Sequence, residues 1–269
     1  MDVSRETRIL TVANQKGGVG KTTTTVNLAA ALAQQGLHVL VIDLDPQGNA
    51  STALDVPHQS GTPDVYRALV DGAALTEVVV PVAAIPGLFC APATIDLAGA
   101  EIELVSLIAR EHRLKRAVED YRLEHVREHG RALDFILIDC PPSLGLLTVN
   151  ALVAASEVLI PIQCEYYALE GLGQLLKTVD LIRTALNPAL RVSTILLTMY
   201  DARTRLAQDV AAEVRAHFGD RVLQTVVPRS VRVSEAPSHH QTVLQYDPMS
   251  PGALSYREAA RELAAGVDA

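Results

Sequence analysis

The chain has 269 residues, of which 49% are hydrophobic and 20% are charged. This composition supplies a sizeable hydrophobic core and excludes an intrinsically disordered chain. The formal net charge of −8 argues against a surface built throughout for nucleic acid, although it allows a local basic face. The three cysteines are widely spaced and form no CxxC pair, so neither a zinc site nor a disulfide framework is indicated.

Short apolar runs rich in β-branched residues alternate with helical patterns along the chain. In chain order they predict a strand at 9–13, a helix at 22–35, strands at 39–42 and 88–91, a long charged helix at 98–129, strands at 135–138 and 158–162, a helix at 169–185, a strand at 192–198, a helix at 206–217, a strand at 222–227 and a last helix at 253–265. This alternation predicts a single α/β domain with a doubly wound, mostly parallel sheet and helices on both faces. Ligands of such sheets bind at the carboxyl ends of the strands.

A glycine-rich loop follows the first predicted strand and leads into the first predicted helix. Its glycines allow backbone N–H groups to turn towards anionic oxygens, and the helix N-terminus adds a positive dipole. Lys21 is placed to reach the β- and γ-phosphates of a nucleotide, and the Thr22 hydroxyl to hold Mg²⁺. The alternative is an ordinary glycine turn before a helix. The expected nucleotide contacts are those of Gly17, Gly18, Val19, Gly20, Lys21, Thr22 and Thr23.

The loop departs from the usual phosphate-loop pattern G-x-x-x-x-G-K-[ST]. The first glycine of that pattern would fall at Gln15, and a second lysine, Lys16, stands just before the glycine pair. The residues alone leave three interpretations of Lys16 open. It is a solvated side chain, it adds charge near the γ-phosphate, or it reaches the nucleotide of a facing subunit.

Two carboxylates end predicted strands beside this loop. Asp139 follows the fourth predicted strand, and we expect it to hold Mg²⁺ through water. Asp45 follows the second, where a carboxylate can orient a water molecule for in-line attack on the γ-phosphate, and it is also a candidate magnesium ligand. In other ATPases a glutamate after the magnesium-binding aspartate often activates water, but here that position is Cys140. Asp45 is therefore the better candidate for the residue that positions the attacking water. The alternative is that Asp45 and Asp43 only cap a turn.

The loop with its early lysine resembles the deviant Walker A loop of the ParA/MinD family of ATPases. Further blocks similar to those of this family follow in order over nearly the whole chain. They lie at residues 43–49, 139–143, 165–171, 198–204, 228–232 and 234–238. Single blocks are weak signals, but the ordered set is specific. It is most similar to the short chromosomal ParA (Soj-type) ATPases, which move DNA with a ParB partner.

The resemblance implies a homodimer that forms when ATP is bound. In this family Lys16 crosses the dimer interface to the partner's phosphates, so two protomers sandwich two ATP molecules with Mg²⁺. Facing nucleotides repel one another unless cations are inserted between them, which gives a physical reason for a crossing lysine. The resemblance also implies that Met199 and Pro228 flank adenine and that backbone groups near Ser230 read its edge. The alternative for Met199 is ordinary packing.

A local basic segment lies within this acidic chain. Residues 183–232 hold eight arginines and four acids, a charge of +4, so the rest of the chain is at −12. This asymmetry suggests one face for polyanions, with salt-sensitive binding to phosphates and no reading of sequence. The blocks similar to the family favour Arg203, Arg229 and Arg232 as contacts with double-stranded DNA. The alternative is solvated arginines paired with neighbouring acids.

The resulting interpretation is a DNA-partitioning ATPase for chromosome or plasmid segregation. The resemblance implies slow hydrolysis that a ParB-like centromere-binding protein stimulates, which releases the DNA-bound dimers. Such a protein is expected in the cytoplasm, associated with the nucleoid and not with a membrane. Because no helix-turn-helix signal precedes the ATPase core, we expect the ATPase domain to span 1–269.

Two other functions are alternatives for this sequence. A MinD-like, membrane-bound regulator of cell division needs a terminal amphipathic helix, but residues 256–269 offer few bulky apolar side chains. A metabolic enzyme on the same scaffold, such as a reductase or an amidoligase, is the second alternative. A reductase with an iron–sulfur cluster needs cysteine ligands, and Cys140 has no suitably placed partner in the sequence.

Overall fold

The computed structural model describes residues 6–165 and 168–265. Its strands are β1 (Arg8–Val12), β2 (Val39–Asp43), β3 (Val80–Pro81), β4 (Leu88–Ala91), β5 (Phe135–Asp139), β6 (Glu157–Gln163), β7 (Arg191–Tyr200) and β8 (Val222–Pro228). Its α-helices are α1 (Lys21–Ala33), α2 (Asn49–Ala53), α3 (Leu97–Glu103), α4 (Arg113–His129), α5 (Leu146–Ala154), α6 (Ala168–Ala185), α7 (Arg205–Phe218), α8 (Val231–Glu235), α9 (Val243–Tyr246) and α10 (Pro251–Ala265). Among these residues no helix is long and apolar enough to span a membrane.

The strands form one sheet in the order β3-β4-β2-β5-β1-β6-β7-β8. Neighbouring strands are parallel, except that β3 runs antiparallel to β4. From β1 the chain runs outward to β2 and β4 on one side, whereas β6, β7 and β8 follow on the other. The strand order therefore reverses next to β1, and the predicted doubly wound fold is confirmed.

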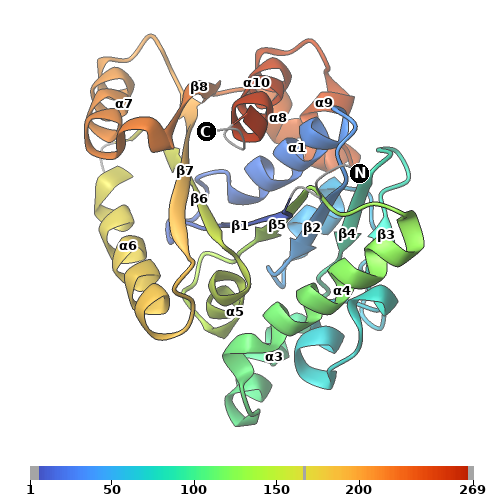
Figure 1. Cartoon of the computed structure of the whole chain (residues 1–269). Helices are drawn as coiled ribbons and strands as arrows, with labels where there is room; N and C mark the ends of the chain where they lie inside the picture. The colour runs from blue at the N-terminus through green and yellow to red at the C-terminus, as the bar shows by residue number, and fades with distance from the viewer. Residues whose placement is uncertain (1–5, 166–167, 266–269) are drawn as a thin grey trace.

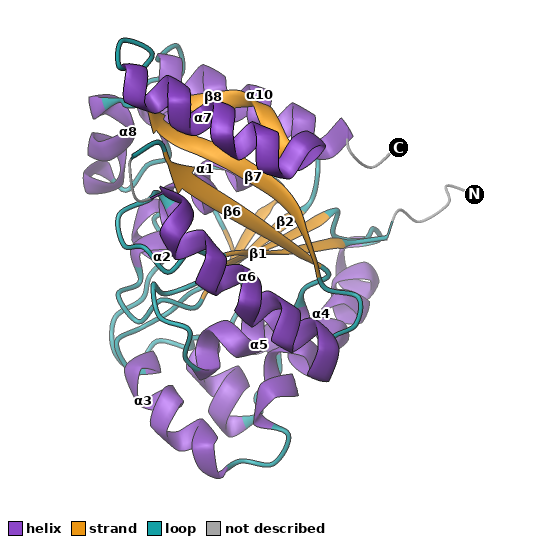
Figure 2. Cartoon of the chain, turned by 90° about the vertical axis from the view of Figure 1, so that its left-hand side faces the viewer, coloured by secondary structure: helices purple, strands orange, loops and turns teal. Residues whose placement is uncertain are grey.

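Helices cover both faces of the sheet (Figure 1). One core layer lies between the sheet and the helices α1 and α10, and the other lies between the sheet and α4 to α7. Because side chains alternate along a strand, Ile136 of β5 belongs to the second layer and Leu137 to the first. In Figure 2 the arrowheads of β6 and β7 lie on the same side of the molecule as α2 and α8.

The helix predicted at 98–129 is wrong as a single element. The segment breaks after α3: Leu107 has an extended backbone, and Ala109 takes a left-handed conformation with φ of 51°. Asn150 of α5 stabilises the break, because its Nδ2 donates to Arg110 O at 2.9 Å and its Oδ1 accepts from Leu114 N at 3.2 Å. A tertiary contact thus fixes the start of α4, where the sequence has neither proline nor glycine.

The register of the sheet brings three strand ends together. Val12, the last residue of β1, pairs with Asp139 of β5, and Asp139 in turn pairs with Asp43 of β2. The loop after β1 therefore begins beside both carboxylates. This edge of the sheet is where a doubly wound fold binds ligands.

Candidate functional site

The glycine-rich loop is held firmly at both sides and leaves open space in front of it. Asn14 Nδ2 donates to Pro161 O at 2.8 Å, and Thr198 Oγ1 donates to Val19 O at 2.9 Å. Gly18 has a φ of 73°, a backbone conformation that favours glycine. A Cβ added at Gly17 or Gly18 would meet no atom within 4 Å. The loop therefore has the room that a phosphate group needs.

Lys21 lies at the start of α1, buried behind this loop. Its Nζ donates to Lys16 O at 3.3 Å. Burial lowers the pKa of Lys21, while the neighbouring carboxylate of Asp139 acts in the opposite direction. A buried ammonium group beside a helix N-terminus fits an anionic ligand, whose negative charge would compensate the positive charge of Lys21.

Asp139 is fully buried at the end of β5. Thr25 Oγ1 donates to its Oδ1 at 3.1 Å, but its Oδ2 finds no hydrogen-bond partner among the described residues. Burial, followed by repulsion from Asp43, raises the pKa of Asp139, whereas hydrogen bonds from Thr22 and Thr25 oppose that rise. Burial likewise raises the pKa of Asp43. A divalent cation at Oδ2 would relieve both effects, so this donor set fits Mg²⁺.

Asp45 begins a turn towards α2. Its Oδ1 accepts from Gln47 N at 3.0 Å, and its own N–H donates to Asp43 Oδ1 at 3.2 Å. The alternative that Asp45 only caps a turn therefore accounts for Oδ1, one of its two carboxylate oxygens. For Oδ2 the described residues supply no hydrogen bond. The carboxylate is half-buried and contributes to the electrostatic environment of Lys21, which places it at the same site.

A small cavity of about 100 Å³ lies beside the start of α1. Its wall combines Gly20 and Thr23 of the loop region with Met199, Pro228 and Ser230, the three residues expected near adenine. Met199 has a φ of 50°, an uncommon backbone conformation for a non-glycine residue that is often found at functional sites. The structure thus brings the expected base contacts next to the expected phosphate contacts.

Lys16 is partly exposed and forms an ion pair within its own protomer. Its Nζ lies 3.2 Å from Glu165 Oε2, just beyond the end of β6. The other oxygen of Glu165 lies 3.6 Å from an Nη atom of Arg229 and also accepts from Gln163 Nε2. Glu165 therefore joins Lys16 to one of the arginines expected to contact DNA.

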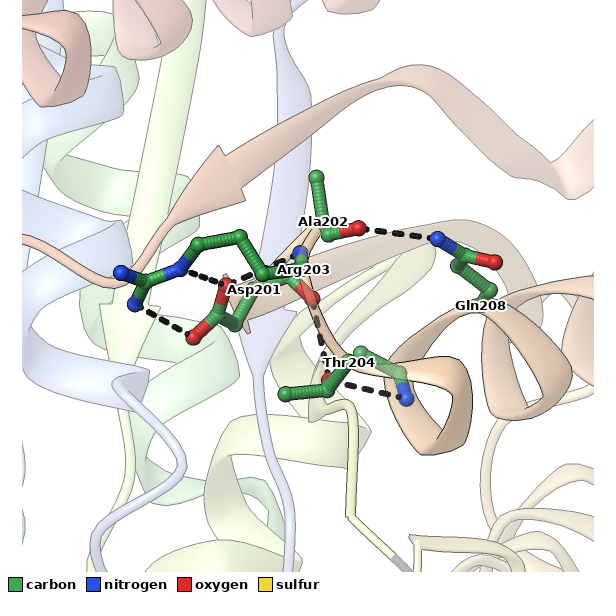
Figure 3. A network of polar contacts seen from close by, with 6 residues as sticks. Asp201, Ala202, Arg203, Thr204 and Gln208 are labelled. Atoms are coloured by element: carbon green, nitrogen blue, oxygen red, sulfur yellow. Dashed lines mark hydrogen bonds and ion pairs between the residues drawn. The ribbon is translucent and has the colours of Figure 1, made fainter.

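Arg203 follows β7 and forms a two-bond ion pair with Asp201 (Figure 3). Its Nε donates to Oδ1 at 2.9 Å and its Nη2 to Oδ2 at 2.8 Å, while the side chain stays 88% exposed. This pairing lowers the pKa of Asp201 to about 2. Thr204 caps α7 by accepting from Ala207 N at 3.3 Å. The local contacts thus fix the loop that presents Arg203.

Arg229 and Arg232 are also exposed at this end of the sheet. Arg229 N donates to Tyr200 O at 3.1 Å, which sets the residue beside the end of β7. Arg232 lies in α8 and pairs with Glu235 at 3.2 Å and Asp247 at 3.5 Å. Each of the three arginines has an acidic partner in the chain, as the alternative interpretation expected.

Sequence reasoning missed three residues that shape this site. Thr25 contacts Asp139, and Thr198 anchors the loop. The fully buried Tyr256 of α10 lines the cavity, with its hydroxyl 3.4 Å from Thr24 Oγ1. The sequence indicated that Thr25 could reach the site, since it lies one helical turn after Lys21. No sequence pattern indicated Tyr256, because it is distant in the chain from every motif.

Residues 7–192 match the family AAA_31, described as an AAA domain. The chain is 52% identical to the sporulation initiation inhibitor protein Soj of Bacillus subtilis, with 96% of this chain and 98% of the relative covered. It is 50% identical to the chromosome-partitioning ATPase Soj of Thermus thermophilus, with 97% and 96% covered. The chain belongs to the ParA/Soj family.

A solved structure supports the fold of this ParA/Soj chain. It is the cobyrinic acid a,c-diamide synthase of Mycobacterium smegmatis with bound ADP and magnesium, at a TM-score of 0.81 and 38% identity. The match covers 96% of this chain and 94% of that one. The family resemblance expected from the sequence is therefore confirmed over nearly the whole length of the chain.

Proposed function

We propose that this chain is a partitioning ATPase in which bound ATP joins two copies and hydrolysis separates them. The observation that carries the proposal is the presence of two lysines on one open phosphate loop. Lys21 is buried behind the loop, whereas Lys16 lies at its rim on an exposed ion pair. Lys16 is partly exposed at the rim, where it would be accessible to the nucleotide of a second subunit.

ATP and Mg²⁺ are the proposed ligands. The backbone of residues 17–20, with Lys21 and Thr23, would hold the phosphates, and the cavity beside Met199, Pro228 and Ser230 would receive the edge of the base. Thr22 and Asp139 would hold the cation, with Asp45 near enough to bind through water. Mg²⁺ supplies neutralisation of the phosphate charge.

Hydrolysis needs a positioned water molecule and charge stabilisation. Asp45 lies next to Asp43 and Lys21, and its second carboxylate oxygen is available to orient water towards the γ-phosphate. Lys21 from one protomer and Lys16 from the other would stabilise the charge on the transferred group. Before that, Lys16 must leave Glu165.

The DNA-binding surface is proposed to consist of Arg203, Arg229 and Arg232. They follow β7 and β8 at the same end of the sheet and stay exposed even though each has an acidic partner. Three arginines per protomer would bind phosphates weakly, and a dimer would double the contacts. ATP state and DNA affinity would then be linked, so the ATP-bound dimer would associate with the nucleoid.

A ParB-like protein is the proposed partner that stimulates hydrolysis and releases the dimer from DNA. The experiment that tests the whole proposal measures DNA retention with ATP, with ADP and without nucleotide, at two salt concentrations. We expect retention with ATP alone and a steep loss at higher salt. Equal retention under all three nucleotide conditions would contradict the proposal.

A second candidate function comes from the Mycobacterium structure, which is that of a diamide synthase. The partitioning relatives are 50–52% identical to this chain, against 38% for that structure, and so favour partitioning. ATP hydrolysis that depends on a carboxylic acid substrate and ignores DNA would favour the synthase. A MinD-like role predicts ATP-dependent sedimentation with liposomes, which the same protein preparation can test.

A further inference from the structure

A second cavity, of about 300 Å³, lies between α4 and the segment 67–77. Its volume is at the lower end of the range of small-molecule sites. None of the described residues that line it belongs to the candidate nucleotide site. Alanine and leucine side chains make up much of its wall. We call it the α4 cavity and define it by the charged and polar side chains that α4 contributes: Arg113, Arg116, Asp120, Tyr121 and Glu124.

The wall opposite α4 is held in place by Arg113. Residues Arg67–Asp71 form a π-helical turn, a rare conformation that is frequent at functional sites. Arg113 Nε donates to Leu69 O, and its Nη2 donates to Val70 O at 3.0 Å. Gly72 then leaves the turn with a φ of 75°. Because one guanidinium group holds two adjacent carbonyl groups of the turn, the cavity is preformed, as small-molecule sites usually are.

Tyr121 brings a buried hydrogen-bonding group to the α4 cavity. The residue is 5% exposed, and its hydroxyl forms no hydrogen bond with the described residues. Burial, and then the negative charge of Glu128, raise the pKa of Tyr121, so the hydroxyl keeps its proton and can donate. A buried hydroxyl without a partner is costly. An acceptor on a ligand in the cavity would supply the missing hydrogen bond.

The charged side chains of the α4 cavity are separated by sign along the helix. Arg113 and Arg116 come first, and Asp120 and Glu124 follow. At a rise of about 1.5 Å per residue, the middle of the cationic pair lies about 11 Å along the helix from the middle of the acidic pair. Glu124 pairs with Arg127, but neither Arg116 nor Asp120 forms an ion pair with any described residue. The cavity therefore has a positive end and a negative end.

We propose that the α4 cavity binds a small zwitterion of the short-peptide class. Its carboxylate would lie at the end with Arg116, its ammonium group at the end with Asp120, and a peptide carbonyl within reach of the Tyr121 hydroxyl. An anion or a cation alone would meet a like charge at one of the two ends. Three residues of extended chain span about 10 Å, which matches the separation of the ends. The proposal goes beyond the proposed function and does not depend on it.

The test titrates the full-length chain with three peptides and follows their binding by saturation-transfer NMR. The probes are trialanine, N-acetyl-trialanine, which lacks the ammonium group, and trialanine amide, which lacks the carboxylate. We expect saturable binding of trialanine at concentrations up to about 10 mM. Each blocked peptide should bind about threefold to fivefold more weakly, which is the effect of losing one exposed ion pair.

Variants of the cavity wall connect the binding to named side chains. Tyr121→Phe should weaken trialanine binding about fivefold, because it removes one hydrogen bond and keeps the ring that packs in the core. Arg116→Gln with Asp120→Asn should abolish the preference for trialanine over the blocked peptides. The matched control is Lys115→Gln with Glu119→Gln, a pair with the same spacing on α4 that lies outside the cavity wall. The control should keep the preference.

Four results would overturn this proposal. They are no saturable binding of trialanine by the wild-type chain, no preference for trialanine over either blocked peptide, wild-type affinity in Tyr121→Phe, and equal loss of preference in the control pair. Circular dichroism shows whether each variant is folded. The comparison of the three peptides on the wild-type chain needs no variant, so it decides the matter even where a substitution prevents folding.

Discussion

Lys16 Nζ lies 3.2 Å from Glu165 Oε2 in the single protomer. Both side chains are more than one third exposed, so solvent screens the pair and its contribution is at most about 1 kcal/mol. The pair nevertheless orients the side chain of Lys16 towards Glu165 of its own protomer. The proposed role of Lys16 at a partner's nucleotide requires that this contact be broken, so the ion pair would compete with the proposed dimerisation.

Replacement of Glu165 by glutamine should favour the dimer. The change removes the charge that holds Lys16 within its own protomer. We expect the ATP concentration needed for half-maximal dimerisation to fall roughly threefold to fivefold, the equivalent of about 1 kcal/mol. Glu213→Gln on the exposed face of α7 is the matched control. An unchanged or higher ATP requirement in Glu165→Gln would show that this ion pair does not oppose dimerisation.

The variant Lys16→Ala should bind ATP but fail to hydrolyse it. Lys21 and the loop backbone remain to hold the phosphates, whereas the cation supplied to the other nucleotide is lost. Removal of one charge-stabilising group typically lowers the rate about 10²–10³-fold. Nucleotide binding and steady-state phosphate release measure the two steps separately, with Lys115→Ala as the control. Full turnover by a monomeric Lys16→Ala protein would exclude the crossing lysine.

The double variant Arg229→Glu and Arg232→Glu should lose DNA binding and keep ATP binding. Both side chains are exposed, and reversing two charges replaces attraction to phosphates with repulsion. Filter retention of duplex DNA at two salt concentrations measures the effect. Arg257→Glu with Arg261→Glu on α10 changes the net charge equally and should retain DNA. If both double variants lose DNA equally, net charge explains the result better than this surface.

Sequence reasoning predicted the strands well because buried parallel strands are continuous apolar runs. The predicted range 88–91 coincides with β4, and the other strand boundaries differ by up to two residues. It failed at 98–129, where the side chain of Asn150 decides the break and no local signal exists. Short helices such as α8 and α9 were also missed, since four or five residues give too little periodicity.

The candidate site was predictable where chemistry follows from spacing along the chain. Asp139 ends β5, and Lys21 and Thr22 begin α1 directly after the loop that follows β1, so their proximity was expected from the fold class. Partners that meet only in three dimensions were not predictable from spacing. Glu165 beside Lys16, and Tyr256 against Thr24, are contacts between segments that are 149 and 232 residues apart.

A buried histidine makes the stability of the chain depend on pH. His125 of α4 is almost completely buried beside His38, His129 and Phe89, and its Nδ1 lacks a partner among the described residues. Burial, then the nearby His129, His38 and Arg131, lower the pKa of His125 to about 4. The unfolded chain therefore takes up this proton first, and stability is lost as the pH falls from about 6.5 to about 4.

The variant His125→Leu should lose less stability than the wild type as the pH falls. We expect the wild-type Tm to fall on the order of 5 °C more than the Tm of the variant between pH 7 and pH 4.5. Thermal unfolding followed by circular dichroism measures the difference. His217→Gln, at an exposed position on α7, should behave like the wild type. Parallel curves for the wild type and His125→Leu would show that this histidine takes up its proton at the same pH in the folded and the unfolded chain.

The most direct test of the account is the particle mass in solution, measured by light scattering with ATP and Mg²⁺, with ADP and Mg²⁺, and without nucleotide. The variant Asp45→Ala lacks the carboxylate proposed to position water and should therefore prevent turnover during the measurement. We predict twice the protomer mass with ATP and the mass of one protomer in the other two conditions. The same mass in all three would contradict the claim that the γ-phosphate holds two copies together.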